Sequence, residues 1–193
     1  MPPRDSPLSG NLRLISVGAA ALIVAVAAYL LIDGGSGSDD SGSGPPPAAA
    51  SVKTAPAVVD SGDLRALSAE LGHPLYWAGP RPGTELELSR EGNGDIYVRY
   101  LTGGAQAGDP RPNFLTVGTY PVPDAAGAVR RAASQAGSEP LDVAHGGTGF
   151  VDPDSPGSVY MAYPGADYQI EVFTPASGEA LRLVEAGKIV PVG

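Results

Sequence analysis

The chain has 193 residues, a formal net charge of −9 and no cysteine. The absence of cysteine excludes disulfides, thiolate metal sites and cysteine nucleophiles. The acidic charge argues against nucleic-acid binding, which needs a basic surface, and against docking on anionic lipid headgroups.

Residues 14–32 form an apolar run without a charged residue. A helix of this length is about 28 Å long, which matches the hydrocarbon thickness of a bilayer. Arg4 and Arg13 precede the run and Asp33 follows it. The positive-inside rule then predicts a short cytoplasmic tail over residues 1–13 and a C-terminal part outside the cytoplasm. We therefore expect a single-pass protein of the cell membrane.

A cleaved signal peptide is the alternative, because Ala25-Val26-Ala27 has the small-x-small pattern of a cleavage site. The apolar run continues beyond this point to Ile32, where a cleavage region should turn polar. This continuation favours an uncleaved signal-anchor.

Residues 33–57 are rich in Gly, Ser, Pro and Ala and contain almost nothing that can be buried. Such a segment cannot form a core that offsets its chain entropy, so a disordered linker is predicted. A flexible chain of this length spans roughly 25–30 Å, which would hold the folded domain a short distance from the membrane.

The remaining residues, 58–193, are predicted to fold as one domain with three helices. The first helix is expected over 63–71, with Ser61 or Asp63 at its cap and Gly72 at its end. Asp124 caps a helix of small residues that runs to Ala136 and closes at Gly137. In the last helix, Thr174 is the expected cap and Pro175 the first residue; Leu181 and Val184 point inward, and Gly187 ends it.

Two hairpins are predicted from alternating apolar residues on either side of a turn. Segments 85–89 and 96–100 flank Glu91-Gly92-Asn93-Gly94, and 158–163 and 168–172 flank a Pro-Gly turn. Further strands are expected at 75–78, 114–120, 141–143 and 188–192. Because strands outnumber the crossover helices of a parallel sheet, the expected fold is α+β, with an antiparallel sheet and about three helices packed on one face.

A segment in the second strand of the first hairpin and a segment in the first strand of the second hairpin are weakly alike. G-D-I-Y-V-R-Y and G-S-V-Y-M-A-Y place their tyrosines at the same offset. A duplicated unit and ordinary hairpin chemistry explain this match about equally well.

The motifs that could carry chemistry favour structural interpretations. His73 and His145 lack metal-ligand spacing, although a dispersed Ser–His–Asp site stays open because triads are spatial. The Gly146–Gly149 stretch lacks the Lys of a phosphate loop and is interpreted as a flexible turn. Asp152-Pro153-Asp154-Ser155 is more typical of a turn than of a calcium-binding loop. No catalytic residue, metal or cofactor is predicted.

The candidate binding residues are aromatic and basic side chains in two segments rich in Gly and Pro. If residues 71–82 are exposed, they would form a recognition surface for a peptide, a glycan or a protein partner. If they are buried, they anchor the core of a small sheet. The loop 109–113 is a second candidate surface contact. The residues singled out are His73, Tyr76, Trp77, Arg81 and Arg111.

The stretch L-G-H-P-L-Y-W-A-G-P, with the later D-P-R-P-N-F-L-T-V-G-T-Y, resembles a group of uncharacterised membrane-tethered bacterial proteins. The resemblance covers most of the folded domain and implies no activity, ligand or functional residue.

An anchor, a spacer and a compact domain without a catalytic constellation favour a binding or accessory module at the cell envelope, with an envelope protein or glycan as its partner. A hydrolase with a dispersed His-dependent site is the enzymatic alternative. A structural or assembly subunit is the third, and a large exposed apolar patch would mark it.

Overall fold

A computed structural model describes residues 53–135 and 137–193. The expected cytoplasmic tail, transmembrane helix and most of the linker lie outside the described residues. Within the described ranges, no helix is both long and apolar enough to cross a membrane.

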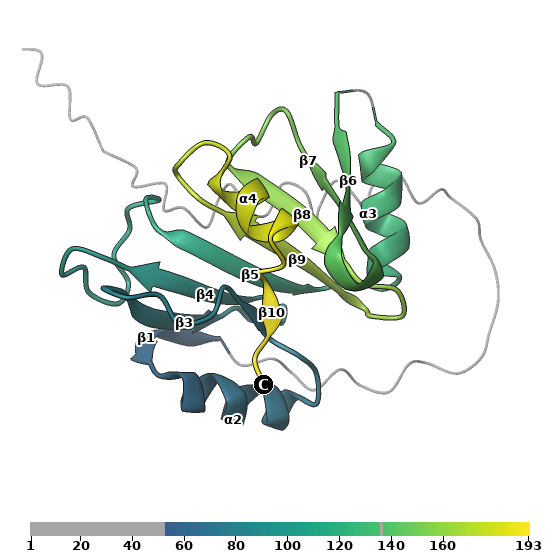
Figure 1. Cartoon of the computed structure of the whole chain (residues 1–193). Coiled ribbons are helices and arrows are strands. Elements are labelled where there is room, and N and C mark those ends of the chain that lie inside the picture. The colour runs from purple at the N-terminus through teal and green to yellow at the C-terminus, as the bar shows by residue number, and fades with distance from the viewer. Residues whose placement is uncertain (1–52, 136) are drawn as a thin grey trace, which may run out of the picture.

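The fold is α+β, as the sequence predicts, and is built on a large antiparallel sheet (Figure 1). Eight strands form this sheet in the order β1-β3-β4-β5-β9-β8-β7-β6, and β10 pairs with β2 in a separate small sheet. The elements are β1 (Thr54–Val59), α2 (Ser61–Leu71), β2 (Tyr76–Trp77), β3 (Glu85–Arg90), β4 (Ile96–Leu101), β5 (Leu115–Pro121), α3 (Ala125–Ala133), β6 (Glu139–Val143), the 3-10 turn η1 (Ala144–Gly146), β7 (Gly147–Val151), β8 (Ser158–Ala162), β9 (Tyr168–Phe173), α4 (Glu179–Glu185) and β10 (Val190–Pro191).

Both predicted hairpins are present. In the first, Leu88 of β3 pairs with Val98 of β4, and Gly94 in the turn has a φ of 95°. That conformation is open to glycine at little cost and strained for other residues, which explains why Asn-Gly is a strong turn signal. In the second, Met161 of β8 pairs with Ile170 of β9.

The helix ends differ in detail from the sequence predictions. Asp60, not Ser61 or Asp63, caps α2: its carboxylate accepts from the backbone N–H of Asp63, whose side chain accepts from the N–H of Asp60 in return. Gly72 ends this helix in the left-handed conformation, as predicted.

The other two helices are shorter than predicted. Asp124 caps α3 as expected, but the helix ends at Ala133, before Gly137. Helix α4 begins only at Glu179, and Gly178 precedes it. Thr174 does not cap a helix; its hydroxyl donates to the carbonyl of Ala176 in the connecting loop. Of the two residues expected to point inward from α4, Val184 is buried and Leu181 is partly buried.

Two strands were not predicted. Residues 54–57, assigned to the linker, belong to β1, which pairs with β3 at the edge of the sheet. The glycine-rich stretch interpreted as a turn enters β7 at Gly147. A Cβ on Gly149 would lie 2.9 Å from the carbonyl oxygen of Tyr160, so glycine allows the close approach of β8 there.

Helices cover both faces of the sheet, whereas one face was expected. Successive side chains of a strand point to opposite faces. On β8, Met161 packs in the main core with Leu64 of α2 and Val184 of α4, while Ala162 packs with Val129 of α3 on the other side. In Figure 1, α4 lies across one side of the sheet, and α3 lies next to β6.

The strands follow a local two-fold symmetry. The order β1-β3-β4-β5 from one edge corresponds to β6-β7-β8-β9 from the other, so β4 and β8, which carry the two similar segments, hold equivalent places. Tyr97 pairs with Gly118, Tyr160 pairs with Glu171, and Gly118 pairs with Glu171. The local two-fold axis therefore passes between Gly118 and Glu171. The helices do not follow it, since α2 and α3 pack on opposite faces.

Candidate functional site

A buried carboxyl group lies at the centre of the sheet, on the face that carries α3. Glu171 of β9 is only 4% exposed. One of its oxygens accepts a hydrogen bond from the Ser158 hydroxyl at 2.6 Å, and the other accepts from the Tyr120 hydroxyl at 2.7 Å. Three neighbouring strands, β5, β9 and β8, thus converge on a single acid.

Gly118 makes this convergence possible. It lies opposite Glu171 in the register, and Tyr120 follows two residues later on the same face of β5. A Cβ on Gly118 would lie 2.6 Å from Cζ of Tyr120, closer than real contacts allow. The missing side chain therefore gives the tyrosine ring room to fold back toward the carboxyl group.

Burial dominates the protonation behaviour of this cluster. Desolvation raises the pKa of the Glu171 carboxyl, and hydrogen bonds from Ser158, Tyr120 and Tyr160 partly oppose the rise. Burial, and then the nearby Glu171 carboxylate, raise the pKa of Tyr120 as well. A buried acid with a perturbed pKa in a cavity is a feature of functional sites more often than of ordinary sheet surfaces.

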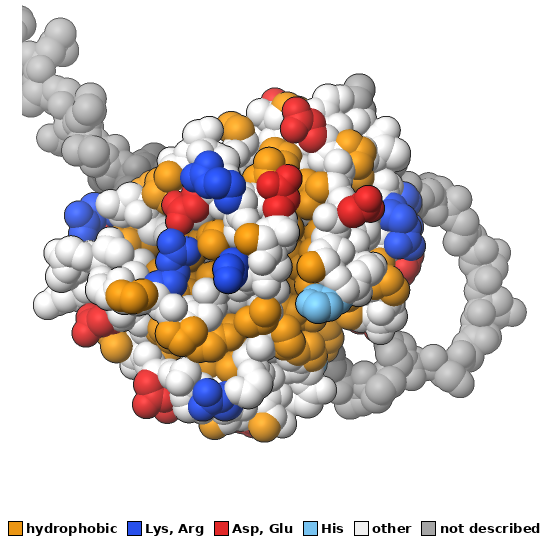
Figure 2. All heavy atoms as spheres, in the orientation of Figure 1, with side chains coloured by type: hydrophobic (Ala, Val, Ile, Leu, Met, Phe, Trp, Pro, Cys, Tyr) orange, Lys and Arg blue, Asp and Glu red, His pale blue; other side chains and the backbone are white. Residues whose placement is uncertain are grey.

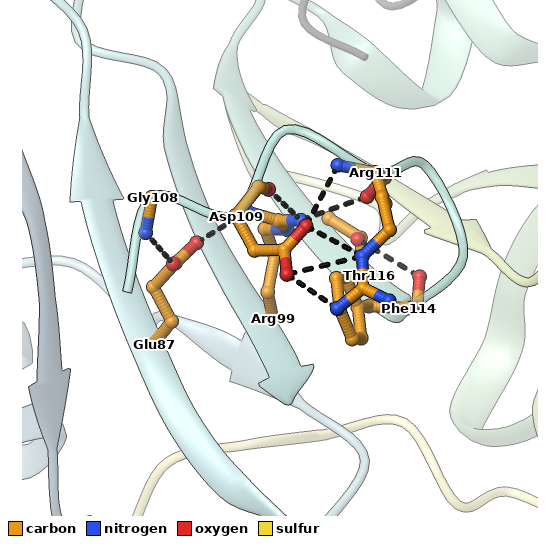
Figure 3. A network of polar contacts seen from close by, with 7 residues as sticks. All are labelled: Glu87, Arg99, Gly108, Asp109, Arg111, Phe114 and Thr116. Atoms are coloured by element: carbon orange, nitrogen blue, oxygen red, sulfur yellow. Dashed lines mark hydrogen bonds and ion pairs between the residues drawn. The ribbon is translucent and has the colours of Figure 1, made fainter. Parts of the chain in front are cut away.

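The loop between β4 and β5 is fastened over the sheet by an ion pair (Figure 3). Glu87 of β3 is 1% exposed and bonds to the Arg99 guanidinium of β4 at 2.7 Å. Its second oxygen accepts from the backbone N–H of Gly108 at 2.6 Å. Arg99 also donates to the carbonyls of Asp109 and Arg111, so the loop backbone is held from both sides.

The same loop carries a second ion pair at its surface. The Arg111 guanidinium bonds to the Asp109 carboxylate at 2.5 Å, and these bonds lower the pKa of Asp109 to about 2. The guanidinium carbons of Arg99 and Arg111 lie 5.0 and 5.7 Å from the centre of the Phe114 ring. Phe114 is thus covered by two cations, each of which has its own acidic partner.

A cavity of about 200 Å³ lies between this loop and the loop that joins β7 to β8. Its lining is mainly apolar, with Phe114, Tyr160 and Phe173 among the walls. A few polar groups also line it, including Ser158 and the Glu171 carboxyl. An apolar hollow with a few convergent polar groups is the usual form of a small-molecule site. Its volume suits a small ligand rather than an enclosed peptide or glycan chain.

The residues singled out by sequence lie in different places. Tyr76 and Trp77 are 6% and 8% exposed and belong to the main core, which is the buried alternative considered for that segment. The Arg81 guanidinium pairs with Glu179 of α4 at 2.9 Å. Arg111 alone among them lines the cavity. Their role in binding remains a prediction.

His73 lies beside a shallow hollow formed by α2 and the last residues of the chain. Its ring stacks on Tyr168 with 4.1 Å between the ring centres. Figure 2 shows the face with α4 and β10, where hydrophobic side chains gather in a band around β10 and basic and acidic groups are mixed above it. The hollow brings His73 together with none of the other four candidates.

Within the described part of the chain, neither histidine ring hydrogen-bonds to a Ser, Asp or Glu side chain. The only hydrogen-bond contact of the His73 ring there is the Pro74 carbonyl oxygen, at 3.2 Å. His145 lies in the turn η1 with a φ of 62°. No three His, Asp or Glu side chains within residues 53–135 and 137–193 are placed to hold a metal ion.

Comparison with protein-family models, with curated proteins and with solved structures gave no significant match to this chain.

Sequence reasoning missed the Glu171 cluster. In the alternating strand 168–172, the glutamate falls between apolar residues and has the pattern of a solvent-facing position. Its partners Tyr120 and Ser158 are 51 and 13 residues away. The available signal was Gly118, because an interior strand glycine indicates the close approach of another group.

Proposed function

We propose that this protein is a single-pass membrane protein whose folded domain, outside the cytoplasm, binds a small organic ligand in the cavity beside Glu171. The observation that carries the proposal is an apolar cavity of about 200 Å³ whose lining includes a buried carboxyl group. We refer to this cavity as the Glu171 pocket. The domain acts as a binding or accessory module at the cell envelope.

The sequence supports the membrane part of this proposal. Residues 14–32 form an uncharged apolar run, flanked by arginines before and aspartates after. The Gly/Ser/Pro/Ala segment that follows suits a spacer between a bilayer and a folded domain. An envelope location gives the pocket access to solutes outside the cell.

Reporter fusions to Gly193 of the full chain test the location. An enzyme active only outside the cytoplasm should give signal in the membrane fraction, while a cytoplasm-active reporter at the same position should give none. The reverse pattern would contradict the envelope location and leave the pocket untouched.

The pocket is tested separately, by thermal unfolding of the full chain in detergent with a panel of small amines, alcohols and carboxylic acids. At least one compound should raise the melting temperature, because a ligand that binds only the folded state stabilises it. Ser155→Trp places a large ring at the pocket lining and should remove the effect.

Ser134→Trp is the matched control, since Ser134 is exposed at the end of α3 and outside the pocket. It should respond to the panel as the unchanged protein does. A panel without any stabilising compound, or one whose effect survives Ser155→Trp, would contradict binding in this pocket.

A further inference from the structure

The charges around the Glu171 pocket are unevenly compensated. The two cations of its lining, Arg99 and Arg111, are each paired with an acid, Glu87 at 2.7 Å and Asp109 at 2.5 Å. The two acids of its lining have no such partner: within the described ranges, neither Asp154 nor Glu171 forms an ion pair.

The hydrogen bonds of Glu171 leave capacity for a donor from the pocket. Ser158 and Tyr120 each donate to one carboxylate oxygen, and Tyr160 is a third hydroxyl donor to the group. A carboxylate offers about four acceptor positions, so at least one stays free for a donor from the pocket. Neutral hydroxyls orient the group but supply no charge to balance it.

The walls of the pocket suit the body of an organic cation. The rings of Phe114, Phe173 and Tyr160 line it. Aromatic faces attract alkyl groups through burial and cations through the ring quadrupole. Burial disfavours the ionised form of Glu171 and so raises the pKa of its carboxyl group. A bound positive charge would stabilise the ionised form and offset this effect of burial.

We infer that the ligand of the Glu171 pocket is a small organic ammonium ion, which places its charged nitrogen at the Glu171 carboxylate and its apolar body against the aromatic walls. This inference rests on the proposed function, namely that the pocket binds a small molecule. It adds the charge class of that molecule, and it assigns Glu171 as the group that selects for it.

The test uses benzylammonium chloride as the probe, with benzyl alcohol and sodium benzoate as neutral and anionic analogues of similar shape. Binding to the full chain in detergent is measured by calorimetric titration at constant ionic strength. Benzylammonium should bind about tenfold more tightly than benzyl alcohol, since a hydrogen bond to a charged group exceeds a neutral one by about that factor. Benzoate should bind least.

Variants identify the group responsible. Glu171→Gln keeps the shape of the side chain and should weaken benzylammonium binding about tenfold while leaving benzyl alcohol within about twofold. Asp154→Asn changes an exposed residue of the lining, so folding is not at risk, and should weaken only the cation, by about twofold to threefold. Asp142→Asn, exposed and outside the pocket, is the matched control and should change nothing.

The outcomes separate the inference from the function on which it rests. Equal binding of all three probes, or preference for benzoate, with loss of binding in Ser155→Trp, would overturn the cation class and leave a ligand pocket in place. Binding of the cation that is unchanged in Glu171→Gln would overturn the role of Glu171, whatever the effect of Asp154→Asn. Absence of binding by all three probes would overturn the inference, and absence of any stabilising compound in the wider panel would overturn the pocket itself.

Discussion

At the scale of single residues, the pocket depends on a difference between two symmetry-related positions. The local two-fold axis of the strands makes Gly118 and Glu171 equivalent, yet one has no side chain and the other carries a buried acid. The empty position accommodates the Tyr120 ring, whose hydroxyl bonds to the acid. One glycine and one glutamate thus convert a symmetric strand pair into an asymmetric site.

Gly118→Ala should therefore destabilise the fold strongly, although it adds only one methyl group. The added methyl group meets the Tyr120 ring, which must move and lose its bond to Glu171. We expect about 2–3 kcal/mol of destabilisation, measured by urea unfolding. Tyr120→Leu removes the ring, so in that background the alanine should cost much less. Equal costs in both backgrounds would show that the ring contact is not the cause.

The stability difference between Glu171→Gln and the unchanged protein should depend on pH. Because burial raises the pKa of Glu171, the folded state holds that proton more tightly than the unfolded state. This contribution to stability is fully present below the ordinary pKa of glutamate and is lost as pH rises through the folded-state pKa.

The glutamine stays neutral at every pH, so its unfolding free energy relative to the unchanged protein should shift in its favour between about pH 4 and pH 7. Urea unfolding at the two pH values measures the difference. Glu139→Gln, exposed on β6, is the control for losing a carboxylate and should show a smaller shift. A shift in the opposite direction would mean that the folded protein favours the ionised form.

Asp109 should titrate in the opposite sense. Its bonds from Arg111 lower the pKa to about 2, and Arg111→Ala should return it toward the ordinary value of 3.8. Carbon-detected NMR titration of the aspartate side chains gives this pKa directly. Arg131→Ala, which removes a distant exposed arginine, should leave it at about 2. A normal pKa for Asp109 in the unchanged protein would mean that the ion pair does not persist in solution.

At the scale of elements, the ion pair between β3 and β4 holds the loop that forms one wall of the pocket. Glu87 is nearly inaccessible, and the Arg99 side chain is 16% exposed. Removing one member of such a pair leaves the other charge buried without a partner. The resulting loss of stability is larger than the net stabilisation that the intact pair provides. The pair therefore matters for loop position more than its net energy suggests.

Arg99→Ala should cost about 3 kcal/mol in urea unfolding, and the Glu87→Ala, Arg99→Ala double variant should cost much less than the sum of its single changes. In the double variant, hydrogen exchange should become faster at the backbone N–H of Gly108, because this N–H bonds to the Glu87 carboxylate. Arg131→Ala breaks an exposed pair with Asp124 and should cost within about 0.5 kcal/mol. Additive costs at Glu87 and Arg99 would contradict a coupled pair.

The elements that the sequence predicts best are those specified by neighbouring residues. The turn at Asn93-Gly94 and the alternation on both sides of it identify the first hairpin without reference to the rest of the chain. Strand β7 was missed because its glycines have the composition of a turn, and only the approach of β8 explains them. Strand β1 was missed because T-A-P-A-V-V follows a Pro/Ala segment and its residues stay exposed or partly exposed at the sheet edge.

At the scale of the whole molecule, the strand order could not be predicted, because the central pair joins distant segments. β5 pairs with β9, and the helix α3 and three strands lie between them in the chain. Long-range pairs of this kind depend on tertiary packing, on which local patterns carry no information. The candidate site depends on that pair, since Tyr120 meets Glu171 only across β5 and β9.

Arg111 was a sequence candidate and lines the pocket, whereas Glu171, Ser158 and Tyr120 were not candidates. An exposed arginine in a loop rich in proline can be recognised from composition. A buried acid on an alternating strand cannot be distinguished from a solvated one until the opposite face of the sheet is known to be covered.

The most direct measurement is a crystal structure of the protein soaked with benzylammonium chloride. The predicted result is density for the ligand between Phe114 and Phe173, with its nitrogen within hydrogen-bond distance of the Glu171 carboxylate. A ligand bound elsewhere, or an empty pocket at a concentration where calorimetry detects binding, would contradict the assignment of this cavity as the ligand site.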